Sequence, residues 1–232
     1  MKILKNITVF TMVMLLSVST ILEAREKNIS NFSSSASNLV DSTGTFDGNK
    51  IYADVANNGL FLDYHVSGDS ALEWPKGTGV HSIFQSALWM GATVNGSIRT
   101  IVGDYTQDMG PGPWGGDPLA AVHRIYKVEK SMLASPLDFA DFQEWPVEFG
   151  APWVDVDGDG VYTPLPGGTD HPEFLGDQVL WFVSNDGDPA YKLNFGTSPM
   201  NVEIQTTMFG FDRPDVFGDM VFLKQLVINK GS

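Results

Sequence analysis

The sequence contains no cysteine among its 232 residues. That absence excludes a disulfide scaffold, a thiolate zinc site and a lipid anchor attached through cysteine. Basic residues are also scarce, because 14 Lys and Arg stand against 28 Asp and Glu and give a formal net charge of −14. A chain with this charge repels nucleic acid and anionic membrane surfaces, so we expect no nucleic-acid partner.

Recognisable catalytic motifs are missing as well. The four histidines form no His-x-x-x-His pair, and no serine lies in a Gly-x-Ser-x-Gly elbow. Acidic residues are abundant, so a carboxylate pair of the glycosidase type stays open, although no particular pair stands out. The sequence therefore favours a protein that is not an enzyme.

A candidate export signal lies at the N-terminus. Lys2 and Lys5 precede an uncharged apolar stretch over residues 7–19, which is too short to span a bilayer comfortably. Such a pattern is typical of a secretory signal peptide, which we place at residues 1–24, with cleavage after Ala24 or after Ser19. An uncleaved anchor or a buried N-terminal helix is the alternative. We expect a secreted or cell-surface protein, exported through the inner membrane, with no membrane span after cleavage.

The rest of the chain is rich in strand and turn signals. We expect a short helix at about residues 135–144, where a serine and a proline open a helical pattern. The turn Asn57-Asn58-Gly59 predicts a hairpin between the first two strands, and Asn95-Gly96 predicts another. Apolar or alternating runs predict strands over residues 50–55, 59–65, 82–94, 97–102, 122–128, 178–184, 201–209 and 220–229.

These elements predict an all-β fold. About nine strands, one short helix and no βαβ rhythm indicate an antiparallel β-sandwich, jelly-roll-like, with long Gly/Pro-rich loops such as residues 103–120. We expect a flexible polar leader over residues 25–48 and the sandwich domain over residues 49–232. The sequence stops directly after a hydrophobic strand, which fits truncation of a longer protein at least as well as a natural end.

The sharpest local motif is the acidic segment over residues 155–162, DVDGDGVY. Carboxylates at positions 1, 3 and 5 converge when such a loop curls around a cation, and glycine at position 6 permits the turn. The pattern departs from an EF-hand at position 12, which is Pro166 instead of a bidentate Glu. The remaining ligands must come from elsewhere, with Asp170, Glu173 and Asp177 as the candidates, and we take Asp177. The predicted calcium ligands are Asp155, Asp157, Asp159, the carbonyl of Val161, and Asp177.

Two other groups of residues each allow two interpretations. The acidic segment 185–188 could bind a cation, but Asn, Asp and Gly are also ordinary turn residues, and we favour the turn. Four tryptophans next to prolines could stack on sugars, but we favour burial at the ends of the sandwich. These are Trp74, Trp114, Trp145 and Trp153, whereas Trp89 and Trp181 lie within strands and are expected in the core.

Several segments together resemble a known type of bacterial module. They are residues 74–77, 88–91, 94–96, 150–162, 176–178 and 184–186. This set is similar to the N-terminal module of large secreted proteins of bacteria that use type IX secretion, and the resemblance covers most of residues 48–232. It implies further β-sandwich modules and a C-terminal sorting domain, which is not present in this sequence. It brings no established activity, and only the Asp-rich loop carries over, as a calcium site.

Three hypotheses for function follow. The first is a non-catalytic secreted or cell-surface module, structural or adhesive, with a calcium-stabilised loop. The second is a carbohydrate-binding accessory module of a secreted hydrolase, suggested by the loop tryptophans. The third is a secreted hydrolase that uses carboxylates, which a deep cleft of acidic side chains would favour. The expected partners are an extracellular glycan or another surface protein.

Overall fold

The structure is a computed structural model, and it describes residues 43–63, 70–103, 106–165 and 170–231. These belong to one unit, Leu39–Ser232. The predicted signal peptide and most of the predicted leader lie outside the described residues. Within the described ranges, no helix is long and apolar enough to cross a membrane.

Strands dominate the described residues, together with short helical turns. The strands are β1 Thr43–Phe46, β2 Tyr52–Ala56, β3 Leu60–Asp63, β4 Leu72–Glu73, β5 His81–Ile83, β6 Gln85–Ala87, β7 Trp89–Val94, β8 Ser97–Val102, β9 Gly110–Pro111, β10 Tyr126–Glu129, β11 Trp153–Val154, β12 His171–Pro172, β13 Gln178–Asn185, β14 Val202–Gly210 and β15 Val221–Asn229. The helical elements are α2 Ala140–Gln143 and the 3₁₀ turns η1 Ala121–His123, η2 Lys130–Ala134, η3 Pro136–Asp138, η4 Val147–Phe149, η5 Pro189–Tyr191 and η6 Val216–Asp219.

All recorded strand pairings are antiparallel. The largest sheet has the order β10-β13-β14-β15, with β9 paired to β13, and a second sheet has the order β1-β2-β4-β5. Three two-stranded ribbons complete the set: β3-β6, β7-β8 and β11-β12. The predicted all-β antiparallel class with one short α-helix is therefore confirmed for the described residues.

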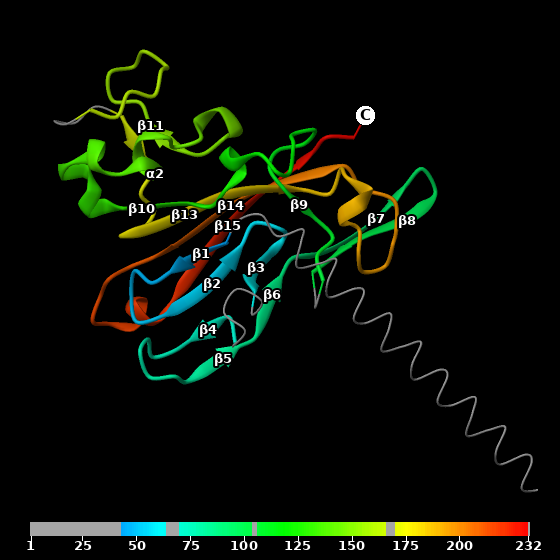
Figure 1. The fold of residues 1–232 in the computed structure, drawn as a ribbon, viewed down its shortest axis with the longest axis horizontal. Helices are drawn as coiled ribbons and strands as arrows, with labels where there is room; N and C mark the ends of the chain where they lie inside the picture. Colours follow the sequence, from blue (N-terminus) through cyan, green and yellow to red (C-terminus); the bar gives the residue numbers. More distant parts are fainter. Residues whose placement is uncertain (1–42, 64–69, 104–105, 166–169, 232) are drawn as a thin grey trace, which may run out of the picture. The chain divides into compact units, whose positions relative to one another are not determined.

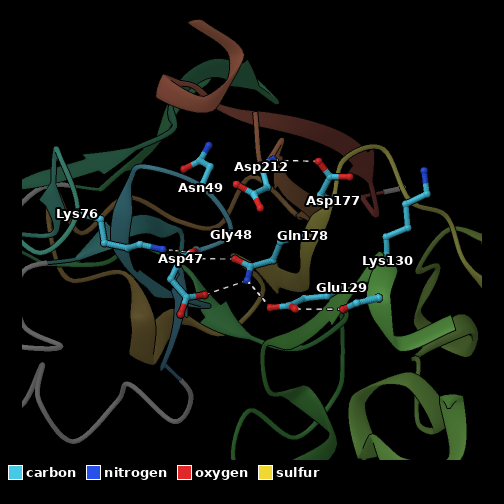
Figure 2. A pocket seen from close by; sticks show the side chains of 10 residues that line it. Asp47, Gly48, Asn49, Lys76, Glu129, Lys130, Asp177, Gln178 and Asp212 are labelled. Carbon is cyan, nitrogen blue, oxygen red and sulfur yellow. Dashed lines mark hydrogen bonds between the residues drawn. The ribbon is translucent and has the colours of Figure 1, made fainter. Parts of the chain in front are cut away.

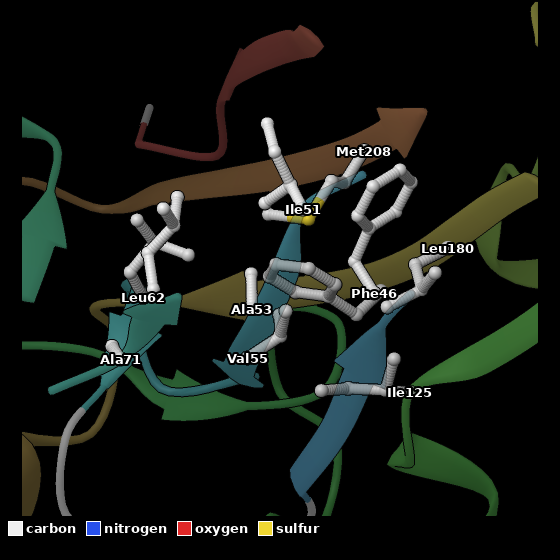
Figure 3. Close-up of a cluster of buried hydrophobic side chains, with 11 residues drawn as sticks. Phe46, Ile51, Ala53, Val55, Leu62, Ala71, Ile125, Leu180 and Met208 are labelled. Atoms are coloured by element: carbon white, nitrogen blue, oxygen red, sulfur yellow. The ribbon is translucent and has the colours of Figure 1, made fainter. Parts of the chain in front are cut away.

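Strand β13 lies at the centre of the fold, and all eight of its residues are buried. Side chains alternate between the two faces of a strand, so each face of β13 contributes to a different hydrophobic cluster. Leu180 and Phe182 pack with Phe46, Val55 and other residues of the β1-β2 sheet (Figure 3). On the opposite face, Trp181 belongs to a second cluster with Phe142 of α2 and Trp145.

The largest sheet is thus covered on both faces. The β1-β2 sheet lies on one side, and the segment that carries α2 and β11 lies on the other (Figure 1). The shared cluster between the two larger sheets is compatible with a sandwich, while the jelly-roll connectivity stays a prediction. This arrangement explains why the run 178–184 reads as continuously apolar instead of alternating.

The prediction of a hairpin across Asn57-Asn58-Gly59, between the strands now labelled β2 and β3, is wrong. β2 pairs with β1 and β4, whereas β3 pairs with β6, so the chain crosses from one sheet to another at Asn57 and Asn58. Both side chains are fully buried: Asn57 donates to the carbonyl of His123, and Asn58 accepts from the backbone of Leu60. These asparagines anchor a crossover and do not form an exposed turn.

Two other boundaries differ from expectation. Residues 43–46 form β1, and Phe46 is completely buried, so the folded unit begins inside the segment expected to be a flexible leader. The helix expected at 135–144 is split into η3 and α2, because Phe139 between them has extended backbone dihedrals. By contrast, the predicted Asn95-Gly96 hairpin is confirmed, with positive φ at both residues joining β7 to β8.

Candidate metal centre

The Asp-rich loop connects the two strands of the β11-β12 ribbon. Val154 pairs with His171 in this ribbon. Asp155 directly follows β11 and Asp170 directly precedes β12, so strand pairing brings these two carboxylates to the same end of the ribbon. The described residues 155–165 therefore start at the same end of the ribbon at which Asp170 lies.

Four aspartates converge in this loop. Asp155, Asp157, Asp159 and Asp170 each offer a carboxylate oxygen, and these oxygens all lie within 4.8 Å of one another. Calcium binds oxygen at about 2.3–2.6 Å, so oxygens on opposite sides of the ion are about 4.6–5.2 Å apart. Magnesium binds at about 2.0–2.1 Å and needs a tighter cluster. The four aspartates could therefore hold a metal ion.

Asp170 fixes both ends of the loop. Its carboxylate accepts hydrogen bonds from the backbone nitrogen of Val156 at 2.9 Å and from that of Thr163 at 2.8 Å. The hydroxyl of Thr163 adds a third bond at 3.2 Å. The backbone bond from Thr163, joined by those from Val156 and the Thr163 hydroxyl, lowers the pKa of Asp170 against the opposing effect of burial. This carboxylate is thus held in its charged form, which is the form that binds a cation.

The other three carboxylates curl the loop through bonds to its own backbone. Asp155 accepts from the nitrogens of Gly158 at 2.7 Å and Gly160 at 2.9 Å. Asp157 accepts from the nitrogen of Asp159, and Asp159 accepts from that of Val161. Carboxylate oxygens have more than one lone pair, so these bonds leave capacity for a cation.

Both glycines of the loop need their conformational freedom. Gly158 has a φ of +78° and Gly160 a φ of +76°, values that side-chain-bearing residues rarely adopt. These turns allow successive carboxylates to point toward one centre. A residue with a Cβ at Gly160 would strain the turn that the sequence motif predicts.

Tyr162 ties the loop to the body of the protein. Its hydroxyl donates to the carbonyl oxygen of Phe142 in α2 at 2.6 Å. Its ring meets that of Trp153 edge to face, with centroids 5.5 Å apart, and burial raises the pKa of the phenol. Phe142 belongs to the cluster that covers β13. Tyr162 therefore serves as a packing anchor and not as a ligand.

Two other predicted or considered ligands lie elsewhere. Asp177 is not part of the four-aspartate cluster: its carboxylate accepts from the backbone nitrogen of Asp212 at 2.9 Å. Glu173 lies 3.7 Å from the ammonium of Lys224. The carbonyl oxygen of Val161 is within 3.5 Å of the Thr163 hydroxyl at the edge of the loop. The residue that sequence reasoning left as an alternative, Asp170, is the one that completes the cluster.

A separate polar cleft of about 570 Å³ contains Asp177 (Figure 2). Gln178 connects two acidic residues of the cleft, because the amide nitrogen of Gln178 donates to Asp47 and to Glu129, each at 2.9 Å. The two accepting oxygens are therefore no more than twice 2.9 Å apart. Asp212 and Asp177 are joined at the cleft as well. Acidic side chains do gather in this cleft, which is the arrangement that the hydrolase hypothesis requires.

The environment of Asp47 does not favour a role as the acid of a catalytic pair. A glycosidase needs one carboxyl that carries a proton and therefore has a raised pKa. Burial would raise the pKa of Asp47, but hydrogen bonds from Lys127 and Gln178 lower it overall. Asp47 and Glu129 also accept from the same amide group of Gln178. These contacts connect β1, β10 and β13 and explain the acidic side chains structurally.

Asp186, in the acidic segment 185–188, has a structural role. Asp186 is fully buried, and its carboxylate accepts from the nitrogens of Met200 and Val202. The ammonium of Lys192 lies 3.8 Å from Asp186 and 3.5 Å from Asp108, so one buried cation pairs with both carboxylates. Asp186 connects the end of β13 to the start of β14, and it is not a member of the aspartate cluster.

The tryptophans divide into buried and exposed groups. Trp145 and Trp181 are buried, at 2% and 1% exposure, which confirms the predictions for both. Trp89 is 65% exposed, so its expected place in the core is wrong: alternation along β7 turns Met90 inward and Trp89 outward. Trp74 is 44% exposed and does not act as a plug, whereas Trp114 and Trp153 are half-buried.

Comparison of the chain with protein-family models, with curated proteins and with solved structures finds no match.

Proposed function

We propose that this chain is an exported, non-catalytic β-sheet module, structural or adhesive in role, whose Asp-rich loop is stabilised by one bound calcium ion. The observation that carries the proposal is the convergence of Asp155, Asp157, Asp159 and Asp170 within 4.8 Å. Oxygen-only ligands of this charge suit calcium, which takes six to eight oxygens in irregular geometry. Water and the carbonyl of Val161 would supply the remaining ligands.

A structural role for the ion follows from where the loop is attached. The loop begins and ends on the β11-β12 ribbon and contacts α2 through Tyr162. Three of its four carboxylates are exposed and repel one another when no cation is present. An ion that removes this repulsion rigidifies a surface loop in a chain without disulfides.

Export and a surface location rest on the N-terminal sequence pattern and on the resemblance to modules of type IX-secreted proteins. A net charge of −14 favours solubility outside the cell and binding of cations. Calcium is abundant in the predicted extracellular compartment, and the Asp-rich loop carries the oxygen ligands that calcium prefers.

The test of the metal site is thermal unfolding in EDTA, magnesium and millimolar calcium. A hundredfold excess over Kd stabilises a protein by about 2.7 kcal/mol. For a unit of this size, that corresponds to a rise in Tm of about 5–11 °C. Magnesium should give a smaller rise. Asp157→Ala should abolish most of the calcium effect while leaving stability in EDTA nearly unchanged or slightly higher.

A matched control is Asp117→Ala. The Asp117 carboxylate accepts from the nitrogen of Leu119 at 3.0 Å, the same local turn bond that Asp157 makes to Asp159 at 3.1 Å. This variant loses an equivalent bond away from the aspartate cluster, so it should keep the full calcium effect. Identical melting curves of the unaltered protein in EDTA and calcium would show that the motif is only an acidic turn.

A further inference from the structure

A recess of about 230 Å³ lies beside β9, away from the Asp-rich loop and the polar cleft. It forms between the segment 110–118 and the segment that follows β13. The side chains of Trp114 and Tyr191 contribute aromatic walls, and Asn185 and Asp188 contribute polar groups. Sites for drug-sized ligands usually measure about 300–1,000 Å³, so this recess has room for one small ring.

The two segments that form the recess are held in place by buried polar groups. Asn185 is 7% exposed, and its amide nitrogen donates to the carbonyls of Gly112 at 2.9 Å and Pro113 at 3.2 Å. Its amide oxygen accepts from the nitrogen of Gly187 at 2.9 Å. The backbone nitrogen of Trp114 donates to the nearly buried carboxylate of Glu203 at 2.8 Å. The recess is thus formed before any ligand arrives, which reduces the entropic cost of binding.

Two glycines give the aromatic rings their positions. A Cβ at Gly187 would lie 2.5 Å from Cζ3 of Trp114, and a Cβ at Gly110 would lie 2.9 Å from Cδ2 of Tyr191. Both rings therefore pack directly on backbone, at distances that only glycine permits. Trp114 stays half-exposed in this position. One part of its indole packs against Gly187, and the side chain also borders the recess.

We propose that this recess binds a single neutral sugar ring of an extracellular glycan. A pyranose ring presents apolar C–H groups that pack against an aromatic side chain, and hydroxyl groups that need polar partners at its edge. Small-molecule sites combine aromatic walls with a few placed polar groups in this way. The Asp188 carboxylate accepts from the nitrogen of Ala190 at 2.8 Å and keeps further acceptor capacity for hydroxyl groups.

Charge narrows the class of sugar. Asp188 is exposed at the rim, and the whole chain carries a formal net charge of −14. An anionic sugar such as a uronate or a sialic acid is repelled by both. A neutral hexose or N-acetylhexosamine is not, so the recess selects neutral over acidic sugars. This inference is independent of the calcium site, because none of the four aspartates of that site lines the recess.

A proline-rich peptide is the competing ligand, because aromatic-lined grooves also bind polyproline helices. Such peptides need an extended groove that contacts several residues. A recess of about 230 Å³ with a polar rim suits one ring better. The two ligands are separated directly by experiment.

The experiment begins with an array of immobilised glycans and continues with calorimetric titration of the folded protein. The probes in solution are the methyl glycosides of glucose, galactose, mannose and N-acetylglucosamine, together with glucuronate, N-acetylneuraminate and an oligoproline. We expect at least one neutral glycoside to bind and both acidic sugars to bind at least tenfold more weakly. Trp114→Ala should weaken the binding at least tenfold. Trp89→Ala, which removes an exposed tryptophan elsewhere, should leave it unchanged.

A second variant keeps the test decisive if Trp114→Ala lowers the stability of the fold. Asp188→Asn retains the side-chain oxygen that accepts from Ala190 but removes the charge. This variant should reduce the ratio of the affinities for the neutral glycoside and for glucuronate. Its melting temperature should be unchanged. The proposal is overturned if no neutral sugar binds, if oligoproline binds in place of sugars, or if sugar binding survives Trp114→Ala in a folded protein.

Discussion

Replacement of Trp145 by alanine tests how the α2 segment is joined to the central sheet. Trp145 is 2% exposed, lies 6.5 Å from Trp181 and 6.3 Å from Tyr126 between ring centroids, and donates to the carbonyl of Pro152 at 3.0 Å. Removal of a buried Trp side chain costs about 3–5 kcal/mol, because transfer energy is lost and a cavity remains. For a unit of this size each kcal/mol corresponds to about 2–4 °C, so Tm should fall by about 6–20 °C.

The matched control is Trp89→Ala. Trp89 also donates its indole nitrogen to a backbone carbonyl, that of Gly103 at 2.6 Å, but it is 65% exposed. Its removal should cost only about 0.5–1.5 kcal/mol, the worth of one hydrogen bond. Urea unfolding followed by circular dichroism gives both values. Equal losses for the two variants, or a loss below about 1 kcal/mol for Trp145→Ala, would refute the three-layer packing around β13.

Three further predictions follow from the fold and the sequence. Phe46→Ala should cost about 3–5 kcal/mol in urea unfolding, because Phe46 is fully buried in β1; a negligible loss would restore the flexible-leader interpretation. In EDTA, the stability advantage of the unaltered protein over Asp170→Asn should be complete above about pH 5 and shrink as pH falls further, because a lowered pKa stabilises the fold only while the carboxylate is ionised. N-terminal sequencing of protein from the native host should find a start near Thr20 or Arg25 outside the inner membrane; intact Met1 on a cytoplasmic protein would contradict export.

Much of the strand pattern could be predicted from local sequence. The run 97–102 coincides with β8, and the runs at 178–184, 201–209 and 220–229 match β13, β14 and β15 to within a residue at each end. These strands are long and strongly apolar, and local pattern is most informative for such segments. The Asn95-Gly96 turn was equally clear, because few residue pairs adopt positive φ at both positions.

Features that depend on long-range pairing could not be predicted in this way. Asn57-Asn58-Gly59 has the composition of a hairpin turn, but its asparagine side chains are buried, and each makes one hydrogen bond to backbone: Asn57 to the distant His123 and Asn58 to the nearby Leu60. The exposure of Trp89 depends on which face of β7 meets the core. Alternation defines two faces, but it does not say which one is inside.

The ligand set illustrates the same limit. The three carboxylates at 155, 157 and 159 follow from local spacing alone. The fourth depends on the pairing of β11 with β12, two strands of only two residues each. That pairing places Asp170 opposite Asp155 and leaves Asp177 at the start of the central sheet. The dipeptide His171-Pro172 after Asp170 favours extended backbone, because the residue before a proline avoids the helical region. A strand of two residues has no periodic pattern, however, so the sequence does not show that it pairs with β11.

The most direct test of the calcium site is calorimetric titration of calcium into protein freed of metal with EDTA. The proposed site predicts one ion per chain for the unaltered protein and for Asp117→Ala. It predicts strongly weakened binding for Asp157→Ala and for Asp170→Asn, because each variant loses one of the four converging charges. Absence of heat with the unaltered protein, or an unchanged isotherm for Asp157→Ala, would contradict the site.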